Sequence, residues 1–201
     1  MINNKINIIG LSGSPRNVSN SSTLLNSLLE GASSAGANCQ LIRAANLEVR
    51  SCTHCDYCRE FGKCLFYDDM NQLYQSFIHA DAIVIASPVY FMGLCSQIKL
   101  IADRLQMFWA FRDTTGKSLI TEKRQSKLPR KGVFIATAAR NTGSVFTGVK
   151  ESMRWVFDAL DCEFWDSMFV GNCENGTDIL SRPELLNDAR ELGKRLTESY
   201  N

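Results

Sequence analysis

The sequence predicts an α/β fold with a doubly wound, five-stranded parallel sheet that carries helices on both faces. Short apolar runs alternate with longer amphipathic segments along the 201 residues. One of these runs, 82–86, is a continuous AIVIA, as expected for a strand buried on both faces. Helix start and stop residues flank several amphipathic segments. A chain of this length predicts a single domain over residues 1–201.

The individual elements follow from these patterns. Five apolar runs predict strands at 6–11, 39–43, 82–86, 133–137 and 163–170. Helices are expected at 22–35, with Gly36 as a stop, and at 68–79, with Asp68 as a cap. A third helix passes through Ile98 and Leu105, and a fourth runs from Val149 to Leu160. The last is predicted from a capping-box spacing of Ser181 and Glu184, with Pro183 in its first turn.

The charge balance excludes several classes of partner. The chain has 22 basic and 21 acidic residues, so it lacks the overall field that drives nucleic-acid or membrane-surface binding. No stretch predicts a signal peptide or a membrane span, so we expect a cytoplasmic protein. With two histidines, a histidine-based metal site or catalytic triad is not expected. A small molecule or a protein is the expected partner.

The loop after the first strand predicts a phosphate site. Ser12, Ser14, Asn20, Ser21 and Ser22 supply hydroxyl and amide groups, Arg16 supplies a forked cation, and the following helix supplies free N–H donors. The loop has neither the Gly-Lys-Ser/Thr ending of a P-loop nor the three-glycine pattern of a dinucleotide site, which leaves a mononucleotide. The alternative is a polar, helix-capping turn.

Two further loops lie at the same predicted edge of the sheet. In the loop 87–93, Tyr90 and Phe91 can border a flat heteroaromatic ring. The loop 138–144 is small and polar enough for such a ring to lie close to it, although an ordinary connection explains it equally well. No side-chain nucleophile or general base is expected, because a bound cofactor would carry the chemistry.

Four of the eight cysteines crowd into residues 51–64. Cys52, Cys55 and Cys58 have the spacing by which bacterial ferredoxins supply three thiolates to an iron–sulfur cube, and Cys64 is the fourth candidate. Gly62 can supply a tight backbone turn. Clustered cysteines in a reducing compartment favour metal or redox chemistry over a disulfide framework. Zinc, redox thiols and a site that has lost its metal remain alternatives.

These motifs together resemble the NADPH-dependent FMN reductase family of flavodoxin-like proteins, and more narrowly its iron–sulfur flavoprotein branch. The residues that carry the resemblance are GSPR, the cysteine run, CLFYDDM and ASPVYFMGLCSQIKLIADR. The resemblance implies FMN, with its phosphate at the serine loop. It also implies a [4Fe–4S] cluster on the four cysteines and a homodimer or homotetramer. It places the isoalloxazine ring beside these residues: Pro88, Val89, Tyr90, Phe91 and Gly93.

Three functional classes follow. The first is an iron–sulfur flavoprotein that passes electrons between the cluster and FMN to a small acceptor, such as a quinone or an oxygen species. The second is a cluster-free, NAD(P)H-dependent reductase of flavins, quinones or azo compounds. The third is a non-enzymatic electron carrier. An insertion at 110–131 is expected to be a loop and has seven basic residues. It could dock an acidic electron donor such as ferredoxin or cover the flavin of a neighbouring subunit. The alternative is a solvated loop with no partner.

Overall fold

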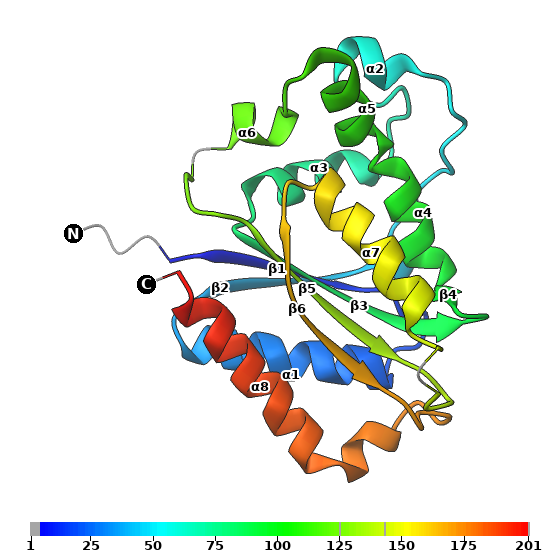
Figure 1. The fold of residues 1–201 in the computed structure, drawn as a ribbon, viewed down its shortest axis with the longest axis vertical. Coiled ribbons are helices and arrows are strands. Elements are labelled where there is room, and N and C mark those ends of the chain that lie inside the picture. The colour runs from blue at the N-terminus through cyan, green and yellow to red at the C-terminus, as the bar shows by residue number, and fades with distance from the viewer. Residues whose placement is uncertain (1–4, 125, 143, 201) are drawn as a thin grey trace.

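The structure is a computed structural model that describes residues 5–124, 126–142 and 144–200. Figure 1 shows a twisted sheet between two layers of helices. The strands are β1 (Asn7–Ser12), β2 (Asn38–Arg43), β3 (Ala82–Tyr90), β4 (Gly93–Leu94), β5 (Lys131–Thr137) and β6 (Glu163–Val170). The α-helices are α1 (Asn20–Ser34), α2 (Tyr57–Phe61), α3 (Met70–His79), α4 (Ser96–Arg104), α5 (Gln106–Thr115), α6 (Leu119–Lys123), α7 (Thr147–Ala159) and α8 (Pro183–Glu198). Two short 3₁₀ turns are η1 (Ala44–Asn46) and η2 (Asp178–Ser181).

The sheet has the predicted doubly wound topology. Its parallel strands follow the order β2-β1-β3-β5-β6, and the short β4 pairs antiparallel with the end of β3. The strand order reverses between β1 and β3, whose registered pairs run from Ile8 and Ala82 to Ser12 and Ala86. Ligands of such sheets bind outside the carboxyl ends of the strands at this reversal. The flavodoxin-like fold class predicted from the sequence is therefore confirmed.

Each face of the sheet has its own hydrophobic core. α1 and α8 cover one face, and α3, α4 and α7 cover the other (Figure 1). Successive residues of β3 alternate between the two cores, since Ile83 and Ile85 belong to one and Val84 and Ala86 to the other. This alternation explains the continuous apolar runs in the sequence. That residues 1–201 form a single domain stays a prediction.

Helices α1 and α8 pack closely against each other at two glycines. A Cβ added at Gly31 would lie 2.0 Å from the carbonyl oxygen of Arg190, and one added at Gly193 would lie 2.0 Å from that of Leu28. Neither position can hold a side chain without separating α1 from α8. The pair fixes α1 in place, and the N-terminus of α1 faces the predicted phosphate loop.

The helix signals were right in part. α1 ends before Gly36, which has a φ of +100°, as predicted. α3 begins at Met70 with Asp69 at the N-cap position, one residue after the predicted cap, although Asp68 Oδ1 accepts from Met70 N–H at 3.1 Å. The capping box is wrong, because Ser181 belongs to η2 and its hydroxyl donates to Asp178 O at 2.8 Å. Pro183 does open α8.

Candidate functional site at the carboxyl ends of β1 and β3

The serine loop is held together by its own hydroxyl groups. Ser22 Oγ lies 2.8 Å from Ser12 Oγ and 2.7 Å from Ser19 Oγ, and Ser22 N–H donates to Ser19 Oγ at 3.2 Å. Ser19 is therefore the N-cap of α1. These side chains are almost fully buried, so the loop is a fixed part of the fold.

Ser21 is the exception in this network. Its side chain is 1% exposed, and its Oγ has no hydrogen-bond partner in the part of the chain that the structure describes. A buried hydroxyl without a partner costs about 1–3 kcal/mol. Because Ser21 lies in the first turn of α1, where the backbone N–H groups and the helix dipole favour an anion, a phosphate would satisfy it. Ser14, 2% exposed, lies in the same loop and accepts a hydrogen bond from Arg16 N–H at 3.3 Å.

Asn20 and Arg16 occupy different positions in this loop. The Asn20 side chain donates to Asn175 O at 2.6 Å and accepts from Ile179 N–H at 2.9 Å, so its amide ties the segment before α8 to α1. The exposed Arg16 side chain lies against Gly176, where an added Cβ would be 3.1 Å from Arg16 Nη1. Among the described residues, the Arg16 guanidinium has no hydrogen-bond or ion-pair partner, while both polar ends of the Asn20 amide have partners.

The first and second loops are locked together. Gly13 N–H donates to Ala86 O at 2.8 Å, and Cys95 Sγ donates to Gly13 O at 3.1 Å. Cys95 N–H donates to Ser87 Oγ at 3.2 Å. Burial raises the pKa of the Cys95 thiol, which agrees with a structural and not a reactive role. The structure therefore brings the predicted phosphate loop and the predicted ring-binding segment side by side.

The predicted second loop is a strand end and a tight hairpin. Val89 pairs with Leu94 and Tyr90 pairs with Gly93, so Phe91 and Met92 form a two-residue turn. Both turn residues have positive φ, at 50° and 62°, which is typical of asparagine and glycine and strained for these side chains. Tyr90 is 47% exposed and Phe91 105%, so the predicted ring-binding residues Pro88, Val89, Tyr90, Phe91 and Gly93 form an open aromatic edge.

The third loop lies beside this edge. Ala138 N–H donates to Val170 O, and Cys173 N–H donates to Ala138 O, which fixes its first residue between β5 and β6. Arg140 and Asn141 are exposed, and Gly143 lies outside the described residues. Residues 139–142 are exposed and follow the carboxyl end of β5, at the same edge of the sheet as the serine loop.

The cysteine segment forms a separate site. Cys52 and Cys55 are exposed and Cys58 and Cys64 are half-buried, and all four line one cavity. Burial raises the pKa of the Cys58 thiol, and neighbouring negative charge on Cys64, Cys52 and Cys55 would raise it further. Within residues 5–124, 126–142 and 144–200, no three His, Cys, Asp or Glu side chains converge closely enough to hold a metal ion.

Short contacts dock this segment on α5. Arg59 of α2 bonds to Asp113 at 3.2 Å, and its guanidinium lies 5.9 Å from the centre of the Trp109 ring. Gly62, predicted to provide a tight turn, has a φ of +58° and ends α2 against Phe111. Figure 1 shows α2 and α5 together at the top of the view, away from the hairpin formed by β3 and β4.

A buried ion pair supports the cavity from below. Arg104 Nη1 lies 2.7 Å from Asp68 Oδ2, and the two side chains are 1% and 8% exposed. Burial alone would raise the pKa of Asp68, but hydrogen bonds from Arg104 and from the N–H groups of Arg50 and Met70 outweigh it and lower the pKa. Arg104 Nη1 also donates to Arg50 O at 2.7 Å, so the pair fixes the chain just before the first cysteine.

An open groove borders the cysteine cavity. It has a volume of about 570 Å³ and lies between α4, α5 and α7. Trp109 and Trp155 contribute its aromatic lining, and Cys52 and His54 belong to both the groove and the cavity. A flat molecule in this groove would lie next to Cys52.

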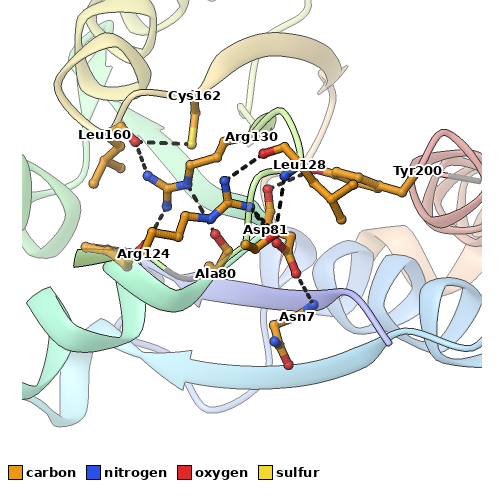
Figure 2. Close-up of polar contacts among 11 residues, drawn as sticks. Asn7, Ala80, Asp81, Arg124, Leu128, Arg130, Leu160, Cys162 and Tyr200 are labelled. Carbon is orange, nitrogen blue, oxygen red and sulfur yellow. Dashed lines mark hydrogen bonds and ion pairs between the residues drawn. The ribbon is translucent and has the colours of Figure 1, made fainter. Parts of the chain in front are cut away.

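The predicted basic insertion is half helical, and four of its seven basic side chains have partners within the described chain, which corrects the expectation of a loop. It contains the end of α5 and all of α6, and Gln125 lies outside the described residues. Arg112 bonds to Asp158 and Asp161, and Arg124 bonds to Asp81 at 2.5 Å. Figure 2 shows Arg130 beside Ala80 and Leu160, and its guanidinium donates to Ala80 O at 3.2 Å and to Leu160 O. It also donates to Phe77 O.

Several residues escaped sequence reasoning. Ser19 was visible as a serine before a helix, but Ser87, Cys95 and Arg104 act through contacts between distant segments. Arg43, at the end of β2, donates to Arg16 O at 2.7 Å and Asn17 O at 3.0 Å and so holds the outer side of the serine loop. No sequence pattern marks such a long-range contact to a backbone oxygen.

A sequence model of the NADPH-dependent FMN reductase family matches residues 6–162. The chain belongs to this family. The match runs from β1 through α7, ends just before β6, and includes the serine loop, the cysteine segment and the hairpin. The resemblance inferred from the sequence motifs is confirmed, and so, at the level of the family, is the enzyme class of flavin-dependent oxidoreductases.

Curated relatives of this FMN reductase family member are iron–sulfur flavoproteins. One from Methanocaldococcus jannaschii is 37% identical over 97 residues, which cover 48% of this chain and 50% of the relative. Another from Methanosarcina thermophila is 36% identical over 97 residues, which cover 48% and 51%. The chain thus spans about half the length of the curated relatives it matches.

Solved structures support the fold. An NAD(P)H:quinone oxidoreductase from Methanothermobacter marburgensis superposes with a TM-score of 0.66 at 19% identity, covering 96% of this chain and 97% of the other. An FMN-dependent NADH-azoreductase from Bacillus anthracis, in complex with FMN, gives a TM-score of 0.63 at 15% identity, with 96% and 98% covered. Across the residues the structure describes, none of the helices is both long and apolar enough to traverse a bilayer.

Proposed function

We propose that the carboxyl ends of β1 and β3 bind FMN, with the phosphate in the serine loop. The observation that carries this proposal is Ser21 Oγ, a buried hydroxyl without a partner in the described chain, at the start of a helix and at the reversal of strand order. Ser12, Ser14 and Ser22 shape the loop, and Arg16 is placed to close over the anion. The backbone of Asn20 belongs to the same helix turn.

The isoalloxazine ring is proposed to lie against the hairpin. Pro88 and Val89 approach from β3, Tyr90 and Phe91 offer aromatic surface, and Gly93 leaves the backbone open. When bound, FMN accepts a hydride or single electrons. NAD(P)H as the hydride donor is supported by the family to which the chain belongs.

The cysteine cavity is proposed to hold an iron–sulfur cluster. Four thiols are a suitable donor set, and they share one cavity with a buried cation, although their side chains are not gathered into a closed metal site. The proposal is supported by the names of the curated relatives, which match this chain over about half their length. Cys52, Cys55, Cys58 and Cys64 would hold a [4Fe–4S] group that exchanges single electrons.

The electron acceptor is proposed to be a small molecule, such as a quinone or an oxygen species. The groove beside the cavity, with Trp109 and Trp155 in its lining, has space for a ring next to Cys52. The separation between α2 and the hairpin in Figure 1 supports a homodimer or homotetramer, in which the flavin of one copy meets the cysteine segment of another. Ferredoxin as a donor has weaker support, since Arg112, Arg124, Arg130 and Lys131 have partners within the chain.

A cluster-free NAD(P)H-dependent reductase is the second candidate function. The observation that favours it is the absence, among the described residues, of a converged group of thiols. In this case the FMN site would be unchanged, and the cysteine segment would be a docking or redox element. The two functions differ in iron content and not in flavin content.

The test begins with anaerobic purification and measurement of FMN, iron and sulfide per chain. About four iron atoms per chain would support the cluster, as expected for a [4Fe–4S] group. Flavin without iron would support the second candidate. Both candidate functions require FMN binding, and calorimetric titration of the apoprotein with FMN tests it. A titration that detects no FMN binding would contradict both functions.

A matched pair of variants tests the phosphate site. Ser21→Ala removes the unpartnered hydroxyl, and Ser27→Ala removes another buried hydroxyl of α1 that lies away from the loop. We expect Ser21→Ala to weaken FMN binding about tenfold, as for a hydrogen bond to a charged group. Ser27→Ala should leave the FMN affinity unchanged, and equal losses in both variants would contradict the assignment.

A further inference from the structure

The chain between β6 and α8 lies along the carboxyl edge of the sheet. Cys173 N–H donates to Ala138 O, at the start of the third loop, and Ile179 is fully buried in the core that α1 covers. We call residues 171–179 the crossing segment. In Figure 1 it is drawn in orange and passes close to the N-terminal end of α1. It lies beyond residue 162, where the family match ends.

Asn20 joins the crossing segment to the first turn of α1. Its side-chain amide donates to Asn175 O at 2.6 Å and accepts from Ile179 N–H at 2.9 Å. Asn20 is only 5% exposed, so these bonds are shielded from water. One partner is an acceptor and the other is a donor, and a primary amide is the side-chain group that can satisfy both at once. Asn20 therefore holds the crossing segment at two points.

Asp178 shapes the turn that presents Asn175 O to Asn20. Its Oδ2 accepts from Asn175 N–H at 2.7 Å. Hydrogen bonds from backbone N–H groups, that of Asn175 foremost, lower the pKa of Asp178. The charge of a carboxylate can only oppose the binding of an anion nearby. The contribution of Asp178 to an FMN site would therefore be the turn that it holds.

The crossing segment also lies against Arg16 of the serine loop. The backbone of Arg16 is fixed by Arg43, which donates to Arg16 O at 2.7 Å and to Asn17 O at 3.0 Å. The side chain of Arg16 lies along Gly176 instead, since a Cβ added there would be 3.1 Å from Arg16 Nη1 and 3.6 Å from Arg16 Cδ. With its backbone fixed, the direction of the Arg16 side chain depends on where the crossing segment lies.

We propose that Asn20, by holding the crossing segment in place, keeps the Arg16 guanidinium at the phosphate of FMN and so sets the preference of the site for phosphorylated over unphosphorylated flavin. The inference rests on the proposed function. Arg16 contacts the phosphate, and Asn20 acts through Arg16 as a positioning residue. A long side chain loses rotamer freedom when it binds, and one that the fold already orients loses less. Riboflavin, which has the same ring and no phosphate, gains nothing from this orientation.

The experiment measures the affinities of the apoprotein for FMN and for riboflavin by calorimetric titration. In Asn20→Ala, we expect the FMN affinity to fall about fivefold, the cost of ordering one long side chain, and the riboflavin affinity to stay within about twofold of wild type. The matched control is Thr197→Val, which removes a buried hydroxyl that donates to Ala32 O at 3.3 Å, near the other end of α1. It should leave the ratio of the two affinities unchanged.

Two variants of Asp178 separate the turn from the charge. Both Asp178→Ala and Asp178→Asn remove the negative charge, but the asparagine oxygen can still accept from Asn175 N–H. We expect Asp178→Ala to weaken FMN binding about threefold, within the range of one hydrogen bond, and Asp178→Asn to bind FMN at least as tightly as wild type. Equal gains of FMN affinity in both variants would overturn the inference, because only the charge would then matter. This pair also decides the question if Asn20→Ala does not fold.

A double variant tests whether Asn20 acts through Arg16. In Arg16→Gln the cation that the crossing segment orients is already gone. Adding Asn20→Ala to this variant should therefore cause no further loss of FMN affinity, as for two residues that act on the same contact. Losses that multiply in the double variant would show that Asn20 acts independently of Arg16 and would overturn the inference.

The outcomes distinguish this inference from the proposed function. Equal losses of FMN and riboflavin affinity in Asn20→Ala would mark a general loosening of the site and would overturn the inference alone. A shift of the affinity ratio in Thr197→Val as large as that in Asn20→Ala would do the same. A wild-type protein that binds no FMN would overturn the proposed function together with the inference, and the wild-type titration shows this before any variant is measured.

Discussion

At the end of the sheet where β3 and β5 begin, Arg130 is 6% exposed, and each of its three nitrogens donates to a backbone carbonyl. At the end where β1 and β3 terminate, Ser21 is 1% exposed, and its hydroxyl has no partner in the described chain. Both residues are buried polar groups beside helix ends. The fold supplies hydrogen-bond partners for Arg130, whereas the hydroxyl of Ser21 can be paired by a ligand.

Helix polarity explains why the two ends differ. Arg130 lies where α3 and α7 end, and the carbonyls of Phe77, Ala80 and Leu160 place the negative ends of two helix dipoles around its charge. Ser21 lies where α1 begins, at the positive end of a dipole. The chain brings its own cation to one end and leaves the other end open to an anion. Burial of a charge alone therefore does not indicate a binding site.

The largest effect is expected from Arg130→Met. This change leaves three buried carbonyl oxygens without their donor, and we expect the free energy of unfolding to fall by about 3–5 kcal/mol. Denaturant titration measures the loss, and FMN affinity of the folded fraction should be unchanged. Arg190→Met, at an exposed arginine that pairs with Glu30 at 3.2 Å, is the control and should cost less than about 1 kcal/mol. Similar losses of unfolding free energy in Arg130→Met and Arg190→Met would show that the buried hydrogen bonds of Arg130 contribute no more than an exposed ion pair.

The pH dependence of stability gives a second test of the Arg130 end. Burial raises the pKa of Cys162, which lies beside Arg130 in Figure 2, from 9.0 to about 11, although the charge of Arg130 acts in the opposite direction. Between these pH values the folded chain keeps the proton and the unfolded chain releases it. The contribution to stability is therefore complete below pH 9 and is lost as the pH rises towards 11.

The variant Cys162→Ala isolates this contribution from the other buried thiols. The stability advantage of wild type over the variant should shrink by roughly 2 kcal/mol between pH 9 and pH 11, at 1.36 kcal/mol per pKa unit. Denaturation curves at several pH values measure it. A constant difference across this range would show that the folded and unfolded chains release the Cys162 proton at the same pH.

Much of the sheet and of the Ser21 end was predictable from the sequence. Continuous apolar runs such as 82–86 record burial on both faces, and a serine-rich turn before a helix records a local preference of the backbone. Both are short-range signals. The cysteine spacing in residues 51–64 is also a short-range signal and could be read from the sequence. Arg104 lines the same cavity but is distant in sequence, so its place there could not be predicted.

The failures of sequence reasoning share a physical cause. Arg112, Arg124 and Arg130 were grouped as a basic loop, because the sequence does not show that Asp81, Asp158 and the ends of α3 and α7 would surround them. The hairpin was missed since Phe91 and Met92 are unfavourable at positive φ, and only the pairing of Tyr90 with Gly93 imposes it. Tertiary contacts overruled the local preference in each case.

A third prediction sharpens the Ser21 end. Arg16→Gln removes the exposed cation of the serine loop, and we expect FMN affinity to fall about tenfold at low salt, as for loss of a charged hydrogen bond. The loss should be smaller at high ionic strength, because exposed charges are screened. Arg140→Gln, at an exposed arginine of the neighbouring loop, is the control and should change the affinity less than about threefold. Equal losses of FMN affinity in Arg16→Gln and Arg140→Gln would indicate a long-range effect of positive charge and would contradict a direct contact of Arg16 with the phosphate.

The smallest effect concerns the strain stored beside the open end. Met92 has a φ of +62°, a conformation that glycine adopts without strain, so Met92→Gly should raise the free energy of unfolding by up to about 1 kcal/mol after the entropy cost of glycine. The reverse change at Gly36, where φ is +100°, is the matched control, and Gly36→Ala should lower stability by about 1 kcal/mol. Denaturation of the apoprotein measures both. If Met92→Gly were destabilising, the side-chain contacts of Met92 would outweigh the backbone strain. The hairpin would then be stabilised by contacts within the fold, as the Arg130 end is, and would differ from the open Ser21 end.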